Sequence, residues 1–102
     1  MTNAKAKWRS PLASLRCVVG SRHGGCSGDM NLHHVAEASG MRHDYALVPL
    51  CHMHHQGKLG IHGLGTKAFL RLYRPPGESE WGLLAWACED AAKFLATKVA
   101  NV

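Results

Sequence analysis

Short apolar runs in the first half of the chain predict strands. Cys17–Val19 and Tyr45–Leu50 are apolar and short, and His33–Val35 lies between them as a further extended piece. Four glycines between residues 20 and 28 predict turns after the first run. The polar stretch Glu37–His43 predicts a loop before the second strand.

The second half of the chain predicts two helices. Thr66–Tyr73 begins at a candidate N-cap and ends before Pro75 and Pro76, which cannot continue a helix. From Ser79 to Lys98, apolar residues recur at alternating spacings of three and four, which places them on one helix face. This apolar stripe consists of Trp81, Leu84, Cys88, Ala91, Leu95 and Val99. We expect it to cover the core, with Cys88 as a buried thiol, and a partner or dimer surface is the alternative.

Length and composition fit one small domain. The chain has 102 residues, of which 46% are hydrophobic and 19% charged, unlike a disordered segment. We divide it into a basic N-terminal arm over residues 1–12, a module over 13–76, and a C-terminal helix over 77–102 that packs on the same domain. At this size a bound metal would add useful stability.

The beginning of the chain predicts a cytoplasmic protein. Pro11, Ser14 and Arg16 interrupt the apolar residues behind the basic start, and no run approaches the roughly 20 apolar residues of a membrane span. We therefore expect no association with a membrane. In the cytoplasm, cysteines close to histidines indicate a metal site more often than disulfides.

The positive charge lies in the part of the chain that holds the histidines. Residues 1–77 carry ten basic and three acidic side chains, whereas residues 78–102 carry two and four. Such a field favours a polyanion such as DNA. A basic surface that only keeps the protein in solution explains the charge alone equally well.

Four residues have spacings that suit a structural zinc site. Cys51 and His54 form a C-x2-H pair, and Cys17 with Cys26 can supply the other two ligands, unless His23 replaces one cysteine. A closed site of this kind contributes folding energy directly. Two disulfides are the alternative, but they explain none of the eight histidines.

A second group of histidines suits a metal site with open coordination positions. The group contains His33, His34, His55 and His62. Adjacent residues of a strand point to opposite faces, so His33 and His34 cannot easily share one role. Three histidine ligands leave room for water or substrate, as in catalytic metal sites. We expect His43 and His52 to be surface histidines.

Three segments resemble the HNH endonuclease superfamily, the ββα-metal or His-Me finger nucleases. They are Leu32-His33-His34-Val35, the run from Asp44 to Cys51, and His54-His55 followed by His62. The pattern is most similar to the phage and prophage branch related to the recombination-enhancement nucleases. The resemblance covers about residues 15–75 and excludes the last helix.

The resemblance implies an α+β fold, namely a zinc-stabilised ββα-metal module with an added C-terminal amphipathic helix. It also implies that the protein hydrolyses DNA phosphodiester bonds. His33, His55 and His62 would bind one catalytic divalent ion (Mg²⁺, Mn²⁺ or Zn²⁺), in addition to the structural Zn²⁺. His34 would be the general base. In the family an Asn shortly before the PLC turn helps to fix this base. Here the best candidate for that role is Asp44, seven residues before Cys51, while Ala46 stands nearer to the usual position of the Asn. A bacterial host cytoplasm and a recombination protein partner follow from the same resemblance.

Basic residues of the module are candidates for contacts with the DNA backbone: Arg22, Arg42, Lys58, Lys67, Arg71 and Arg74. Arg71 and Arg74 are expected to share a helix face at i, i+3. No recognition helix is visible, so we expect phosphate contacts with weak sequence preference. The alternatives to an endonuclease are a noncatalytic zinc-stabilised DNA-binding accessory protein and, more remotely, a metal-storage or sensor protein.

Overall fold

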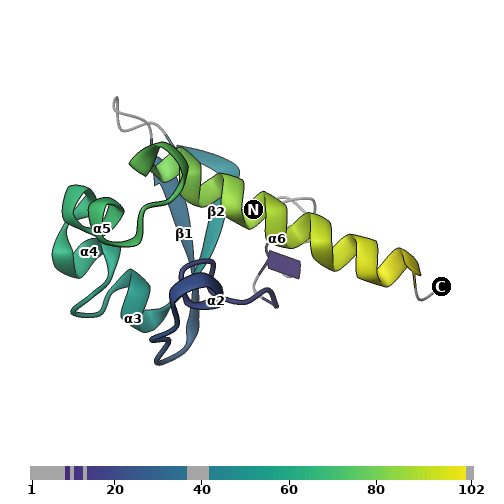
Figure 1. Ribbon diagram of the computed structural model, residues 1–102, viewed down its shortest axis with the longest axis horizontal. Coiled ribbons are helices and arrows are strands. Elements are labelled where there is room, and N and C mark those ends of the chain that lie inside the picture. Colours follow the sequence, from purple (N-terminus) through teal and green to yellow (C-terminus); the bar gives the residue numbers. More distant parts are fainter. Residues whose placement is uncertain (1–8, 10, 13, 37–41, 101–102) are drawn as a thin grey trace.

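Figure 1 shows the computed structural model, which describes residues 9, 11–12, 14–36 and 42–100, without the side chains of 36, 42 and 98–100. The α+β class is confirmed, because a two-stranded sheet is combined with helices. The elements, in chain order, are α2 (Gly20–His23), β1 (Met30–Ala36), β2 (Arg42–Cys51), α3 (His52–His55), α4 (Ile61–Leu64), α5 (Thr66–Tyr73), the 3-10 turn η1 (Pro76–Glu78) and α6 (Glu80–Ala100).

The sheet is an antiparallel ribbon of β1 and β2. Its register pairs Met30 with Cys51 and His34 with Leu47, and it shifts between His34 and Ala36. The predicted second strand is confirmed and begins earlier, at Arg42. Of the loop predicted over Glu37–His43, residues 37–41 lie outside the described residues.

The strand predicted at Cys17–Val19 is wrong. This segment precedes the single-turn helix α2, where turns were expected, and it does not belong to the sheet. Val18 donates one backbone hydrogen bond to the carbonyl of Pro49 in β2, at 3.1 Å. Cys17, Val18 and Val19 are all buried. The apolar run therefore packs into the core without pairing as a strand.

Both predicted helices of the second half are present. Helix α5 spans the predicted residues, but Thr66 is its first helical residue and the N-cap is Gly65, so the prediction of Thr66 as N-cap is wrong. Arg74 ends the helix in the left-handed conformation, with φ of 52°. The predicted long helix is α6, which crosses the ribbon and extends beyond it (Figure 1). Among the described residues, the longest helices lack the continuous apolar length that crossing a membrane would require.

The side of α6 that faces the core is not the predicted stripe. Leu83 and Ala87 are buried, at 0% and 2% exposure, whereas Trp81 and Leu95 of the stripe are 52% and 60% exposed. Cys88 is exposed, so the expectation of a buried thiol is wrong. Each helical residue is turned by about 100° from the one before it, so the buried side lies beside the stripe and shares its border.

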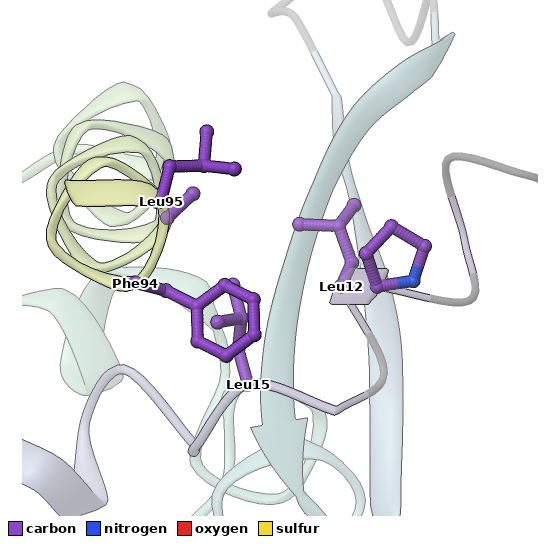
Figure 2. Close-up of a pocket in the computed structure, with 6 residues that line it drawn as sticks. Leu12, Leu15, Phe94 and Leu95 are labelled. Carbon is purple, nitrogen blue, oxygen red and sulfur yellow. The ribbon is translucent and has the colours of Figure 1, made fainter. Parts of the chain in front are cut away.

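Part of the stripe borders an apolar pocket of about 120 Å³ between α6 and the segment before Cys17. Figure 2 shows Phe94 and Leu95 of α6 on one side of it and Leu12 and Leu15 on the other. Leu12 is 3% exposed, so this end of the predicted N-terminal arm is packed against the domain. Residues 1–8 and 10 of the arm lie outside the described residues.

Candidate metal centres

Three segments bring together the residues of the predicted zinc site. Cys17 lies just before α2 and Cys26 in the loop after it, while Cys51 ends β2 and His54 lies one turn later in α3. One donor atom of each residue lies within 4.8 Å of the others, in a set of four that could hold a metal ion. His23, the alternative ligand, does not belong to this set.

The geometry around His54 is that of a shared centre. Its Nδ1 atom lies 3.2 Å from the sulfur of Cys51, 3.4 Å from that of Cys17 and 4.0 Å from that of Cys26. The backbone N–H of Gly20 donates to the Cys17 sulfur at 3.3 Å, which suits a thiolate. All four cysteines of the chain are free thiols, so the disulfide alternative finds no support here.

The charge balance of this Cys3His cluster favours a cation. Burial raises the pKa of the Cys17 thiol. Burial and the neighbouring Cys17 charge raise the pKa of Cys26 to about 12. At Cys51 burial opposes ionisation, but N–H donors of His54 and Ser27 and the other thiols lower the pKa. Three thiolates in one cluster would repel one another, and a divalent ion such as zinc could balance their charge.

His54 is held in the neutral form that a ligand needs. Burial, and secondarily the charge of His23, lowers its pKa. Its ring packs edge-on against Tyr73 of α5, with centroids 5.2 Å apart. The Tyr73 hydroxyl donates to the carbonyl of Leu59 at 3.2 Å, so α5 also holds the chain that leads into α4. Cys and neutral His donors in this number fit a structural Zn²⁺.

The second predicted set of ligands is also assembled. His33 of β1, His55 of α3 and His62 of α4 have donor atoms within 4.8 Å of one another. The ring centroid of His33 lies 5.3 Å from that of His55 and 5.5 Å from that of His62, and the centroids of His55 and His62 are 4.8 Å apart. His33 is buried, His55 half-buried and His62 exposed, so this three-histidine cluster opens to the surface on the side of His62.

Glycines make the return from His55 to His62 short enough. A Cβ atom at Gly60 would collide with the carbonyl of His55, and one at Gly63 with the carbonyl of Gly57. The turn between Gly57 and Gly60 is closed by a backbone hydrogen bond of 2.9 Å. This tight path places α4 beside α3, so His62 reaches the cluster although it follows His55 by seven residues.

Two polar side chains that the sequence did not single out contact the cluster. Asn31 Oδ1 lies 3.0 Å from Nδ1 of His55, and Glu80 Oε1 lies 2.8 Å from Nε2 of His33. Asn31 lies two residues before His33, on the same face of β1, and this spacing is a signal that could have been used. Glu80 is the first residue of α6 and follows His33 by 47 residues. Acidic residues are common at the start of a helix because they interact favourably with the helix dipole, so the sequence alone does not indicate a contact with His33.

The protonation state of His55 suits metal binding. Burial lowers its pKa to about 4, with smaller contributions from charge on His33, His62 and His52. The ring is therefore neutral at physiological pH. Because Nδ1 is engaged with Asn31, Nε2 is the ring atom that could bind a metal ion. Three imidazole side chains in this arrangement could hold a divalent cation such as Zn²⁺ or Mn²⁺.

His34, the predicted base, lines the same pocket as the three-histidine cluster. The pocket has a volume of about 250 Å³ and is lined by Leu32, His33, His34, His55, Gln56 and His62. Residues of both faces of β1 contribute, because β1 is an edge of the two-stranded ribbon. His33 and His34 can thus take different roles at one site.

Asp44 does not share this position. It is exposed on β2 and is not among the residues that line the pocket. The polar side chain that contacts His55 is instead Asn31, which lies on β1, whereas Asp44 lies on β2. The exposed His43 and His52 agree with the expectation of surface histidines.

The basic residues proposed for the DNA backbone have different environments. Lys58, Lys67, Arg71 and Arg74 are all exposed. The expectation that Arg71 and Arg74 share a helix face is wrong, because Arg74 lies after α5 in the left-handed conformation. Lys67 and Arg71 share a face of α5 instead, at i, i+4.

Arg22 is engaged within the fold. Its guanidinium donates to both carboxylate oxygens of Asp90, at 2.9 Å and 3.0 Å, and lies 4.7 Å from the ring centre of Trp86. It therefore ties α2 to α6 and is not available as a phosphate contact.

Comparisons with protein-family models, with curated proteins and with solved structures find no match to this chain.

Proposed function

We propose that this protein is a metal-dependent endonuclease of the HNH type that hydrolyses DNA phosphodiester bonds. One observation carries the proposal: three histidine donors within 4.8 Å of one another share an open pocket with a fourth histidine, His34. The motif resemblance of the sequence and the ribbon followed by short helices support the same conclusion. A structural Zn²⁺ in the Cys3His cluster would hold the pocket's walls in place.

In this proposal each histidine has a separate task. His33, His55 and His62 hold the divalent cation, which when bound supplies Lewis-acid stabilisation of charge on the phosphate. His34 takes a proton from the attacking water, because a neutral imidazole accepts protons efficiently near neutral pH. Burial keeps His55 neutral, and the hydrogen bond with Asn31 orients its ring.

Exposed basic residues that lie close in sequence to His55 and His62 support DNA as the substrate. Lys58 lies between α3 and α4, and Lys67 and Arg71 lie on α5, directly after the helix that carries His62. Such side chains bind phosphates without reading bases, so cleavage would have weak sequence preference. A role in phage recombination or DNA processing in a bacterial cytoplasm, with a recombination protein as partner, belongs to the same proposal.

Plasmid nicking tests the proposal directly. Purified protein, loaded with zinc, is incubated with supercoiled plasmid and Mg²⁺, Mn²⁺ or additional Zn²⁺. We expect His34→Ala to lower the nicking rate by about 10²–10⁴-fold, the contribution typical of a general base. His52→Ala, an exposed histidine outside the pocket, is the matched control and should nick normally. Equal nicking by His34→Ala and the control would overturn the assignment of His34.

A noncatalytic DNA-binding protein is the second candidate. The Cys3His cluster and the exposed basic residues favour it, because neither requires the three-histidine cluster to work. Under this alternative the protein shifts DNA in a gel but nicks no plasmid with any of the three ions. Binding that survives while cleavage is absent would replace the endonuclease proposal with this one.

A further inference from the structure

Glu80 connects the last helix with the three-histidine cluster. Its Oε1 atom lies 2.8 Å from Nε2 of His33, and the two side chains are 19% and 8% exposed. A contact this well shielded between a carboxylate and an imidazole fixes the direction of the ring. Glu80 comes from α6, which lies outside the segments that resemble the nucleases.

We propose that Glu80 is a positioning residue that selects the donor atom of His33. An ionised carboxylate can only accept hydrogen bonds, so Nε2 of His33 must carry the proton that is shared with Glu80. A neutral imidazole has one proton, and Nδ1 is then the atom with a free lone pair. His33 thus offers Nδ1 to the cation, in the arrangement known from other metal-bound histidines that donate to a carboxylate.

The placement of Glu80 argues against a role as a fourth ligand. The donor atoms that lie within 4.8 Å of one another belong to His33, His55 and His62, and the carboxylate of Glu80 is not part of that set. The carboxylate therefore contacts His33 without lying within 4.8 Å of all three donor atoms. This position is suited to orienting the ligand and increasing its basicity.

The same arrangement occurs at His55 with the opposite ring atom. Nδ1 of His55 contacts Asn31 Oδ1 at 3.0 Å, and an amide oxygen also accepts, so Nε2 is left for the cation. The cluster would therefore use Nδ1 of one histidine and Nε2 of another. The two orienting side chains come from different parts of the chain, β1 and α6.

This inference rests on metal binding by the three-histidine cluster and does not require DNA cleavage. The first test is the tautomeric state of His33 in protein that holds zinc in the Cys3His cluster only. Long-range ¹H–¹⁵N NMR spectra of the histidine side chains distinguish the two neutral tautomers. We expect the Nε2–H form for His33 and the Nδ1–H form for His55. An Nδ1–H form of His33 would overturn the proposal.

The second test separates orientation from ligation by using two variants of Glu80. Mn²⁺ is titrated into the zinc-loaded protein, and free Mn²⁺ is measured by electron paramagnetic resonance. We expect Glu80→Ala to weaken Mn²⁺ binding by about 10–100-fold, and Glu80→Gln to recover much of the loss because its amide oxygen still accepts from Nε2. Glu89→Ala, which removes an exposed carboxylate from the same helix, should bind as the unmodified protein does.

The outcomes are decisive in both directions. Unchanged Mn²⁺ affinity in Glu80→Ala, or equal losses in Glu80→Ala and Glu80→Gln, would contradict a positioning role. Thermal unfolding of each variant shows whether the fold is intact, and the tautomer measurement on the unmodified protein does not depend on the variants at all. If plasmid nicking fails while these results hold, the proposed function is wrong and the role of Glu80 in metal binding remains.

Discussion

The two candidate metal centres differ in how the chain builds them. The ligands of the Cys3His cluster come from the segment around α2 and from the junction of β2 with α3, and three of the four are buried. The three-histidine cluster combines β1, α3 and α4, and its ligands range from buried His33 to exposed His62. The first centre is closed by protein donors, whereas the second leaves one side to solvent.

This difference suggests separate roles, with the Cys3His cluster stabilising the fold and the three-histidine cluster available for chemistry. Adjacent residues His54 and His55 belong to different centres, so the single turn α3 is shared by both. A closed sulfur-rich centre adds folding energy, and an open imidazole centre leaves positions for water and substrate. We therefore expect that damage to the first centre removes the second, whereas damage to the second leaves the first intact.

The largest effect is expected from removal of the structural metal. Cys51→Ser, or treatment with a strong chelator, should unfold the domain, because structural zinc contributes roughly 10 kcal/mol or more and a small domain has about 5–15 kcal/mol in total. Circular dichroism during chelation measures the loss. Cys88→Ser, which alters an exposed thiol outside the cluster, is the control. A folded protein after zinc removal would show that the Cys3His cluster does not hold the domain together.

Loss of an open-centre ligand should leave the fold intact. His55→Ala is expected to weaken Mn²⁺ binding by more than the 10–100-fold that loss of an orienting partner costs, while the melting temperature of the zinc-loaded protein changes by only a few degrees. Mn²⁺ titration and thermal unfolding are measured on the same sample. Collapse of His55→Ala to an unfolded chain would mean that the two centres are not separable in this way.

A smaller effect is expected at Asn31. Asn31→Ala removes the acceptor that orients His55, so Mn²⁺ affinity should fall by about 10-fold, less than in His55→Ala. The matched change is Asn31→Asp, which keeps an acceptor oxygen at the same place and should bind Mn²⁺ more tightly than Asn31→Ala. Identical affinities of Asn31→Ala and the unmodified protein would remove Asn31 from the site.

The smallest effect is expected at the exposed cations of α5. Each of Lys67→Ala and Arg71→Ala should reduce the slope of log K for DNA binding against log salt concentration by about 0.9, uniformly across DNA sequences. Fluorescence anisotropy at several salt concentrations gives the slope. Lys93→Ala, on α6 and paired with Glu89, should leave it unchanged. Equal slopes in all three variants would place the DNA on another surface.

Local patterns were sufficient to predict the ligands but not their support. Cys51 and His54 lie on one turn, so their spacing predicts ligands of the closed centre. His55 follows directly, and the resemblance to HNH nucleases together with its position predicts it as a ligand of the open one. The contact of Glu80 with His33 joins residues 47 positions apart, and nothing local in the sequence indicates it. Local sequence therefore identifies the candidate ligands, whereas tertiary packing determines which atoms they present.

The same distinction applies to α6 and to the first apolar run. Periodicity predicted the helix but not the side that is buried. Leu83 and Leu84 lie on adjoining faces of α6, and packing against the rest of the domain buries Leu83 fully, at 0% exposure. Cys17–Val19 was predicted as a strand because it is short and apolar. In the structure, the carbonyls of Cys17 and Val19 instead accept the backbone hydrogen bonds that start α2, and Val18 donates a single hydrogen bond to Pro49 of β2.

Gly20 limits which sequences can build the closed centre. A Cβ atom at this position would collide with the sulfur of Cys26, and that sulfur cannot move aside while it shares a centre with Cys17, Cys51 and His54. We therefore expect any side chain at residue 20 to displace the Cys26 sulfur from the other three donor atoms. A related protein that assembles the same Cys3His cluster should carry glycine within the spacing C-x2-G-x5-C, which is a constraint beyond the four candidate ligands themselves.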